Sequence, residues 1–472
     1  MDEIIQESLG DSLEYLTLEG LMSLVLANHP VVRQADLLPE NARQELRLAR
    51  GAFDPKLEAS WDAKNFQDTE YYDIVNTTLK VPTWFPIDPK VSVDRNKGVF
   101  LNPENSIPGP DKGGNYRQVS VGVSVPLARG LMIDQRRASV RQAQLFQEIT
   151  DAERIKMINK ILLSAAKDYW DWYYAYYNYR LVTESFNISN EIYRRVKLEF
   201  SFGEVAAIDT VQAAITQQNR SIDQQEAMIN YKRATLQLSN NLWGEQEEPL
   251  EISDLLVPQW IGTEVNPMAT GLLDTLVTTA MQRHPELRKL DGKLGQLVIE
   301  EKLAKEQLKP RLDVEYNLIN SPITEFGELA ELQFRDNYKF GVSFEFPLFL
   351  RKERAKVKQT QIKIDQTEYE LDLKQRQIIN SINADYFQLS NAQNMLGLIQ
   401  QAVNNYKRLL DAELYNLTLG ESDLFKINFQ QDKLLEAETK LLKLQSLMEK
   451  ARVNLYWSAG VPFLDFESLY LD

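Results

Sequence analysis

The stretch FSFGEVAAIDTVQ, residues 200–212, has a counterpart later in the chain, LTLGESDLFKINF, residues 417–429. In each copy a Gly-Glu pair interrupts a long segment that is free of proline. The two glycines, Gly203 and Gly420, are 217 positions apart. A spacing that recurs elsewhere in the chain would indicate a repeated supersecondary unit.

The repeat extends toward the N-terminus of each glycine stretch. ANHPVVRQADLL, residues 27–38, resembles QRHPELRKLDGK, residues 282–293, and the prolines of the two stretches are 255 positions apart. The first copy is longer than the second, because the offset falls from 255 here to 217 at the glycines. The sequence therefore predicts two structural repeats, 1–250 and 266–472, joined by a linker at 251–265.

Long helices are predicted on both sides of each glycine. Residues 131–199 contain no glycine or proline, and residues 351–419 contain only one glycine. At 1.5 Å per residue, each helix would be ~100 Å long. The returning helices, predicted at 204–243 and 421–457, carry apolar residues every seven positions, which is the spacing of a coiled coil. These positions are Ile208, Ile215, Ile222, Ile229, Leu236 and Trp243, followed in the second repeat by Ile427, Leu434, Leu441, Met448 and Leu455.

Four runs alternate between apolar and polar residues, the period of a β-strand with one apolar face. They are predicted at about 55–66 and 115–126 in the first repeat, and at about 310–320 and 337–347 in the second. The segment 67–114 is rich in proline, asparagine and aspartate, and it is predicted as a long loop between strands. An ordinary variable loop is favoured over a lid or a partner contact, although loops of this length are uncommon unless functional or disordered. Four strands alone need either a core of their own or strands from other chains.

The composition excludes several classes of function. A net charge of -15 argues against a nucleic-acid surface, and the absence of cysteine excludes disulfides and thiolate zinc sites. Only His29 and His284 are available as imidazole ligands, so no metal is expected. Each precedes a proline, which predicts a structural role at the start of a new helix. No glycine loop for phosphate, catalytic triad or suggestively spaced carboxylate pair is present, so we expect neither an enzyme nor a cofactor.

Two features bear on the compartment. No run of 18 apolar residues occurs, so the sequence predicts no transmembrane helix. The first ten residues, MDEIIQESLG, are acidic and lack the apolar region of a secretory signal. We therefore expect either a cytosolic protein or a chain whose signal has been removed.

The repeated order of short helix, two alternating strands, long helix, glycine turn and heptad helix resembles the TolC family of outer-membrane ducts. The likeness is closest at the two glycine stretches and at VPLARG and FPLFLR, where strands give way to helices. It covers the chain from about Tyr15 to Phe463. It implies an α+β membrane protein in the bacterial outer membrane, in which three chains of four strands close a multi-pass 12-stranded β-barrel above a coiled-coil tunnel through the periplasm.

The same resemblance implies a passive function. The chain would be the exit duct of a tripartite efflux pump or a type I secretion system, and it would conduct substrates that an inner-membrane transporter supplies. The implied partners are two further copies in a homotrimer, a periplasmic adaptor protein, the inner-membrane transporter and outer-membrane lipid. No nucleic acid is expected among them.

Two groups of site residues follow from the resemblance. The adaptor is expected to dock at the helical tips, which are Phe202, Gly203 and Glu204, and Leu419, Gly420 and Glu421. Members of the family often place acidic residues six and nine positions after the second tip glycine, where this chain has Lys426 and Phe429. The chain therefore departs from an acidic ring at the tunnel mouth. Phe429 or Leu424 could instead form an apolar constriction, to which Asp423 could add charge, and a solvated helix face is an equally good interpretation. The gate candidates are Asp209, Asp423, Leu424, Lys426 and Phe429.

The stretch KDYWDWYYAYYNYRLVTE, residues 167–184, has eight aromatic residues in the eleven positions from Tyr169 to Tyr179. A ligand-binding box, a belt at a membrane interface and a packed helix all fit this composition. The rings point to all sides of a helix, and the stretch lies ~60 Å along the predicted helix from the strands. Packing between helices at the thickened middle of the tunnel is therefore the prediction.

Two other classes of protein remain alternatives. A soluble coiled-coil scaffold or interaction protein with a small antiparallel sheet explains the heptads and the acidic N-terminus, but it leaves two matched pairs of alternating strands without a reason. A periplasmic hydrolase would show turnover of a model substrate, which we do not expect.

Overall fold

The structure is a computed structural model that describes residues 14–102, 106–107, 116–262, 268–320, 322–323, 337–419 and 421–461. The chain divides into two compact units. The first contains Met1–Leu38, Asp151–Arg288 and Asp372–Asp472, and the second contains Pro39–Thr150 and Lys289–Leu371.

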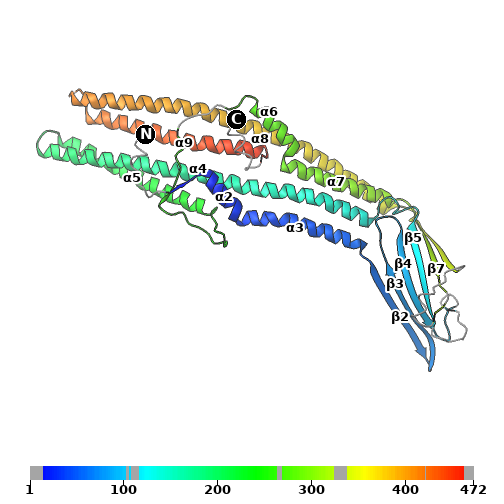
Figure 1. The fold of residues 1–472 in the computed structure, drawn as a ribbon. Helices are drawn as coiled ribbons and strands as arrows, with labels where there is room; N and C mark the ends of the chain where they lie inside the picture. Colours follow the sequence, from blue (N-terminus) through cyan, green and yellow to red (C-terminus); the bar gives the residue numbers. More distant parts are fainter. Residues whose placement is uncertain are drawn as a thin grey trace. The chain divides into compact units, whose positions relative to one another are not determined.

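The elements of the first unit are mostly helical (Figure 1). They are β1 (Glu14–Leu16), α2 (Leu18–Asn28), α5 (Ala207–Ser239), β6 (Leu256–Pro258), α6 (Leu272–Arg283) and α9 (Leu424–Ser458). Four helices contribute residues to both units: α3 (Pro30–Arg50), α4 (Gln135–Ser201), α7 (Pro285–Glu306) and α8 (Arg351–Thr418). The short strand β6 lies inside the segment predicted as a linker, where it pairs in parallel with β1.

The long helices α4 and α8 have 67 and 68 residues. Both follow from the absence of proline and the near absence of glycine in these segments, because only these residues break a helix strongly. The helix α4 begins at Gln135, slightly later than predicted. The carboxylate of Asp134 accepts a hydrogen bond from the backbone N–H of Arg137 at 2.8 Å, which is the geometry of a helix N-cap.

A single antiparallel sheet dominates the second unit. Its strand order is β2-β3-β4-β5-β7-β8. The strands are β2 (Lys56–Phe66), β3 (Thr69–Lys80), β4 (Asp88–Lys97), β5 (Arg117–Pro126), β7 (Arg311–Ile319) and β8 (Tyr338–Glu345). Strands β2, β5, β7 and β8 cover the four alternating runs of the sequence. Figure 1 shows the strands side by side, with the short 3-10 helix η1 (Gly51–Phe53) leading into β2.

The prediction of four strands in this chain is wrong, because β3 and β4 lie within the segment 67–114 that was predicted as a loop. Proline, asparagine and aspartate elsewhere in this segment obscured two alternating runs. In β3, Val75, Thr77 and Leu79 share one face, and the threonine weakens the apolar signal. Both new strands are inserted between β2 and β5, so the sheet is half as large again as expected. The count of 12 strands for three chains thereby loses its basis.

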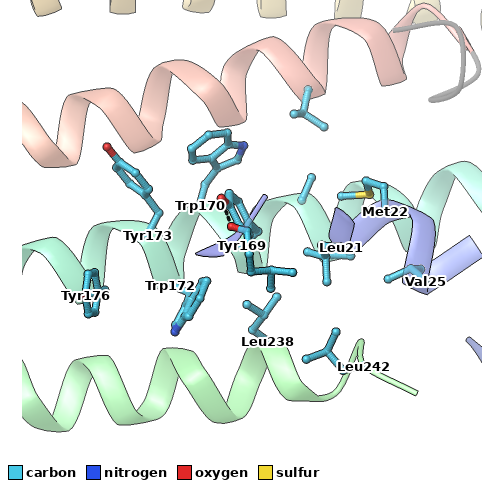
Figure 2. Close-up of a cluster of buried hydrophobic side chains, with 14 of the residues drawn as sticks. Leu21, Met22, Val25, Tyr169, Trp170, Trp172, Tyr173, Tyr176, Leu238 and Leu242 are labelled. Atoms are coloured by element: carbon cyan, nitrogen blue, oxygen red, sulfur yellow. Dashed lines mark hydrogen bonds between the residues drawn. The ribbon is translucent and has the colours of Figure 1, made fainter. Parts of the chain in front are cut away.

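The aromatic stretch forms the core of the first unit, as predicted. Tyr169, Trp170, Trp172 and Tyr173 are at most 4% exposed. Figure 2 shows the rings on two sides of α4: Trp172 points toward Leu238 of α5, whereas Trp170 and Tyr173 point toward α9. Leu21, Met22 and Val25 of α2 complete the cluster next to Tyr169, and Leu242 lies just past the end of α5. The hydroxyl of Tyr169 donates a hydrogen bond to the carbonyl of Leu16 at 3.0 Å, and that of Tyr177 to the carbonyl of Pro258 at 2.9 Å. The rings therefore pack the helices together and also hold both strands of the β1–β6 pair.

We expect Trp172→Ala to destabilise the first unit by about 3 to 5 kcal/mol, because the fully buried indole leaves a cavity and its hydrogen bond to Thr235 is lost. Trp457→Ala is the matched control, since Trp457 is 44% exposed and should cost less than about 1 kcal/mol. Guanidinium unfolding followed by circular dichroism measures both changes. Equal losses would contradict the assignment of the aromatic stretch to the core.

Candidate functional site

The six-stranded sheet has two chemically distinct faces. Along most of one side of the sheet, which we call the apolar face, apolar residues lie opposite apolar residues. Toward the β2–β3 turn the same side carries charged residues, where Asp73 of β3 pairs with Arg95 and Lys97 of β4. Its apolar members are Leu57, Ala59 and Trp61 of β2, Val75 and Leu79 of β3, Val91 and Val93 of β4, Val119, Val121, Val123 and Val125 of β5, Leu312, Val314, Tyr316 and Leu318 of β7, and Tyr338, Phe340, Val342 and Phe344 of β8. Many of these side chains are exposed in the single chain, so the sheet does not bury this face on a core of its own.

The opposite side of the sheet, the polar face, is held together by side-chain contacts between strands. Lys80 of β3 forms an ion pair with Glu58 of β2 at 2.7 Å, and Lys90 of β4 pairs with Glu315 of β7 at 2.8 Å. The hydroxyl of Thr78 donates to that of Ser92 at 3.0 Å. A sheet with these two faces separates an apolar environment from an aqueous one.

Both edges of the sheet are unpaired. Among the described residues, β2 is paired only with β3, and β8 only with β7. Every residue of β2 and of β8 is exposed. An edge strand of this length presents backbone N–H and C=O groups that another strand can pair with.

The first helical tip is a tight turn that glycine makes possible. Gly203 has φ +79° and follows the last turn of α4. Its N–H donates to the carbonyl of Phe200 at 3.0 Å, and the N–H of Glu204 donates to the carbonyl of Glu199 at 3.0 Å. These two bonds form a Schellman motif, which satisfies the last carbonyls of a helix. Phe202 is 71% exposed beside the turn, so its ring is presented to solvent.

The second tip has one bond of the same kind. The N–H of Glu421 donates to the carbonyl of Asn416 at 3.0 Å, and Leu419 is 56% exposed. Gly420 itself lies outside the described residues. Each tip therefore pairs an exposed apolar residue with an acidic one, and the docking of an adaptor there stays a prediction.

Two of the predicted gate residues have local roles at the tips. The carboxylate of Asp423 accepts a hydrogen bond from the N–H of Lys426 at 2.9 Å and caps α9. In the first repeat, the carboxylate of Asp209 accepts from the N–H of Ala206 at 3.0 Å, at the start of α5. Capping satisfies N–H groups that have no partner in the helix, so these two acids are explained without any role in a gate.

The remaining gate candidates lie on the first turns of α9. Lys426 is exposed and Phe429 is 49% exposed, whereas Ile427 between them is buried. The ammonium of Lys433 lies 5.7 Å from the centre of the Phe429 ring. The side chain of Leu424 is outside the described part. Lys426 and Phe429 thus face away from the packed side of α9.

A charged contact that sequence reasoning missed joins α5 to α9. Arg220 forms an ion pair with Asp432 of α9, and its guanidinium also pairs with Asp223 at 3.2 Å. The side chain of Arg220 is only 13% exposed. These residues border a cavity of about 500 Å³ that also contains Glu226 and Glu436. A surplus of acids in the sequence gave no indication that one arginine is shared between two of them.

The heptad positions behave differently in the two repeats. Ile427, Leu441, Met448 and Leu455 of α9 are at most 3% exposed and pack inside the chain, as coiled-coil positions should. The equivalent positions of α5 form an exposed apolar stripe, which consists of Ile208, Ile215, Ile222, Ile229 and Leu236. Each of these five side chains is more than half exposed. An apolar stripe of this length on one helix indicates a surface that another chain covers.

The two histidines lie at helix breaks, as predicted. Both have extended backbone, and the next residue is the first of α3 or α7. The Nδ1 atom of His29 accepts a hydrogen bond from the N–H of Val31 at 3.1 Å, and that of His284 accepts from the N–H of Glu286 at 3.2 Å. Burial lowers the pKa of His284 to about 4. Over the described residues, no cluster of histidine, aspartate and glutamate is arranged to hold a metal ion.

None of the helices in the described ranges contains an apolar stretch of the kind that a bilayer crossing requires.

Comparison with known proteins supports the interpretation of the fold. Residues 276–461 match the family model described as outer membrane efflux protein. No curated protein matches the chain.

Solved structures match over almost the whole length of the chain. The open-state MtrE outer-membrane channel of Neisseria gonorrhoeae is 15% identical over 94% of this chain and 89% of that one, with a TM-score of 0.66. The CmeC outer-membrane channel of Campylobacter jejuni is 15% identical over 94% and 85%, with a TM-score of 0.64. The outer-membrane protein VceC of Vibrio cholerae is 14% identical over 94% and 96%, with a TM-score of 0.63. At this identity the likeness is one of fold.

Gly203→Ala should destabilise the first tip by about 1 to 2 kcal/mol, because an L-residue pays that cost at positive φ. Gly397→Ala is the matched control, since Gly397 lies inside α8 and alanine should stabilise it by up to about 1 kcal/mol. An added Cβ has no atom within 4 Å at either site, so packing does not contribute. Hydrogen exchange at the ends of α4 and α8 measures the two effects. If both substitutions changed the stability in the same direction, the left-handed turn at Gly203 would be contradicted.

We expect the contribution of His284 to the stability of the first unit to fall as the pH drops from 6.5 toward 4. The neutral form of His284 is favoured in the folded state because its pKa is lowered, so at this side chain the unfolded chain binds more protons in this range. The contribution of His284 to the free energy of unfolding decreases by about 2 to 3 kcal/mol when the pH reaches about 4.

Buried and half-buried acids of the same unit whose pKa is raised, Asp168, Asp385, Glu438 and Glu449, act in the opposite direction, so the effect is read as a difference from a variant. His284→Asn keeps a side-chain acceptor for the Glu286 N–H but does not titrate, so its unfolding midpoint should depend less on pH. An unchanged pH dependence would contradict the assignment.

Proposed function

We propose that this chain, whose residues 276–461 belong to the outer membrane efflux protein family, is a trimeric exit duct of the bacterial outer membrane. Substrates would pass through it from an inner-membrane transporter, and the chain itself would perform no chemistry. Whether the pump is an efflux system or a type I secretion system depends on the transporter. The fold shared with MtrE, CmeC and VceC supports the proposal.

The two-faced sheet is the observation that carries the proposal. It has an apolar face and a polar face across all six strands, and both of its edges are open among the described residues. In lipid, an unpaired backbone N–H or C=O group costs several kcal/mol, so a sheet is stable there only when it closes on itself or on copies of itself. Closure by several chains places the apolar face toward lipid and the polar face toward a water-filled passage.

The helical part supports the same assembly. The apolar stripe of α5 is exposed in the single chain, although its heptad spacing is that of a packed seam. A neighbouring copy in a homotrimer would cover it. The exposed tips, Phe202 with Glu204 and Leu419 with Glu421, are the surfaces where we place the periplasmic adaptor. The net charge of -15 gives no reason to add a nucleic acid to these partners.

We place the restriction on passage at the contact between α5 and α9. The largely buried Arg220 holds Asp432 and Asp223 together, so the two returning helices are tied by charge. Removing one member of such a pair leaves the other without compensation. Phe429 remains a candidate for an apolar constriction nearer the tips, since its ring is half exposed. Asp209 and Asp423 act as helix caps there.

A soluble scaffold is the alternative, and recording of ionic current separates the two. The purified protein, added to a planar lipid bilayer, should give discrete conductance steps. Arg220→Ala should raise the conductance several-fold, because the tie between α5 and α9 is lost. Asp432→Ala should have a similar effect, and the double variant should add little to either single one.

Arg43→Ala is the control for this experiment, because the exposed Arg43 pairs with Glu40 within α3 and this ion pair ties α3 to no other helix. Its conductance should equal that of the wild type. A wild-type protein that inserts into no bilayer and remains in the soluble fraction would contradict the duct. If the wild type conducts and Arg220→Ala has the same conductance, only the location of the restriction is contradicted.

A further inference from the structure

The number of strands in the wall and the way in which copies join are not determined by the family resemblance, because this sheet has six strands rather than four. We propose that three chains close an eighteen-stranded wall, in which β8 of one copy pairs antiparallel with β2 of the next. The register of this junction places Lys56 opposite Glu345 and Asp62 opposite Lys339. Such a wall rests on the proposed function.

The direction of the edge strands allows this junction. Five antiparallel pairings separate β2 from β8, so the two edges of the sheet run in opposite directions. The edge β8 of one copy is therefore antiparallel to β2 of another without any rearrangement. The apolar face must also continue across the junction, and because side chains alternate along a strand, only every second register achieves this.

Charge selects one of the allowed registers. In the proposed register the lysine–glutamate pair of residues 56 and 345 and the aspartate–lysine pair of residues 62 and 339 are both attractive. A shift of two residues in one direction places Glu58 opposite Glu345 and Lys64 opposite Lys339. Like charges directly opposite each other destabilise a strand pair.

A shift of two residues in the other direction gains no attraction. It places Lys56 opposite Ser343 and Lys339 opposite Ser60. Asp62 then lies opposite Asn337, and Glu345 extends past the first residue of β2. We call this alternative the uncharged register.

Of the four charges of the junction, Lys339 has an electrostatic attraction to Asp94 of β4 in its own chain, short of an ion pair. Within the described part of the chain, Lys56, Asp62, Lys339 and Glu345 form no ion pair, whereas Glu58 of the same edge strand β2 and Glu315 of β7 do. The apolar residues also fit, because the register brings Trp61 opposite Phe340. All eight residues of β8 lie opposite residues 56–63, so the junction leaves no residue of β8 unpaired.

The stagger of the strands supports the same register independently. The pairs that lie straight across the sheet run through Lys56, Lys80, Lys90, Gly122, Asn317 and Lys339. Since Lys339 then faces Asp62, one chain advances the register by six residues, from 56 to 62. Since each chain also contributes six strands, the register of the closed wall advances by one residue for every strand.

This ratio of one residue per strand is that of the eight-stranded barrel with a shear of eight, whose strands tilt by about 36°. Transmembrane barrels have tilts of about 35–45°. The uncharged register advances by two-thirds of a residue per strand. This corresponds to a strand tilt of about 26°, which lies outside that range. The register with like charges opposed gives about 44°. Only the proposed register satisfies both the charges and the tilt.

The consequence is a wider wall than twelve strands would form. The circumference of a barrel grows with the strand number, so eighteen strands give about 1.5 times the circumference. Barrels of 16–18 strands leave an aqueous channel rather than a packed interior. Strands β3 and β4 belong to this wall because they continue both faces of the sheet between β2 and β5.

Disulfide formation between introduced cysteines tests the register, since the chain has no cysteine of its own. Ser60→Cys combined with Gly341→Cys lies on the polar face, and Ala59→Cys combined with Val342→Cys lies on the apolar face. One of these two pairs is of the closer, non-hydrogen-bonded kind. A Cβ at Gly341 has no atom of its own chain within 4 Å, so cysteine fits there. Mild oxidation of the trimer in detergent should link copies into dimers and trimers on a non-reducing gel.

The comparison pairs shift the register by two residues. Ser60→Cys with Ser343→Cys and Ser60→Cys with Lys339→Cys should react at least ten-fold more slowly than the faster of the two expected pairs. Mixed trimers of Ser60→Cys chains and Gly341→Cys chains should also cross-link, which shows that the bond joins two copies. Faster reaction of a shifted pair, or a bond within one chain, would overturn the junction while leaving the duct intact.

Charge reversal provides a second readout that does not depend on disulfide geometry. Asp62→Lys should lower the temperature at which the trimer dissociates, because two lysine side chains would then face each other across the junction. Adding Lys339→Asp to this variant should bring the dissociation temperature most of the way back to that of the wild type. If the double variant is as unstable as the sum of the single ones, the two positions do not face each other. A wild-type protein that is monomeric in detergent would instead remove the proposed function itself.

Labelling decides whether β3 and β4 are part of the wall. Ser92→Cys on the polar face should react with a water-soluble maleimide in proteoliposomes, and Val93→Cys on the apolar face should react only with a lipid-soluble one. Equal reaction of both with the water-soluble reagent would place these strands outside the lipid and leave twelve in the wall.

Discussion

The hydrogen-bonding groups along the free edges of β2 and β8 are the constraint on which the rest of the molecule depends. In the described part of the chain, each edge strand carries N–H and C=O groups without a strand partner. Lipid offers no substitute for water as a partner, so the edges must be paired before the apolar face enters a membrane. In the proposed duct, assembly and insertion are thus one problem, and pairing with copies of the same sheet would solve both.

The helices of the first unit carry a similar requirement. The seam of α9 is buried within the chain, whereas the stripe of α5 has the same spacing and is exposed. The aromatic residues of α4 fix the first unit internally, so the stripe and the tips are held on a firm scaffold rather than on loops. Two helices with the same heptad spacing thereby differ: α9 packs inside the chain, whereas in the proposed homotrimer α5 would offer its stripe to a neighbouring copy.

Much of this architecture could be predicted from the sequence, for identifiable reasons. Long segments without proline or glycine define α4 and α8, strict alternation defines four strands, and the glycines mark the turns. Strands β3 and β4 could not be recognised, because Asp73 and Thr77 of β3 and Arg95 and Lys97 of β4 lie on the side of their apolar residues and weaken the alternation. The pair of Arg220 with Asp432 joins positions 212 residues apart, and no local pattern reports such a contact. Acids near the tips were recognisable, but their use as helix caps depends on where each helix begins.

A three-dimensional reconstruction of the protein in lipid nanodiscs, by electron cryo-microscopy, tests the central claim most directly. We predict a threefold ring in which eighteen strands surround a water-filled passage, with β8 of each copy adjacent to β2 of the next. A ring of twelve strands with β3 and β4 outside it would contradict the arrangement of the wall. A single chain with one sheet edge bare in the lipid would contradict the requirement that every edge be paired.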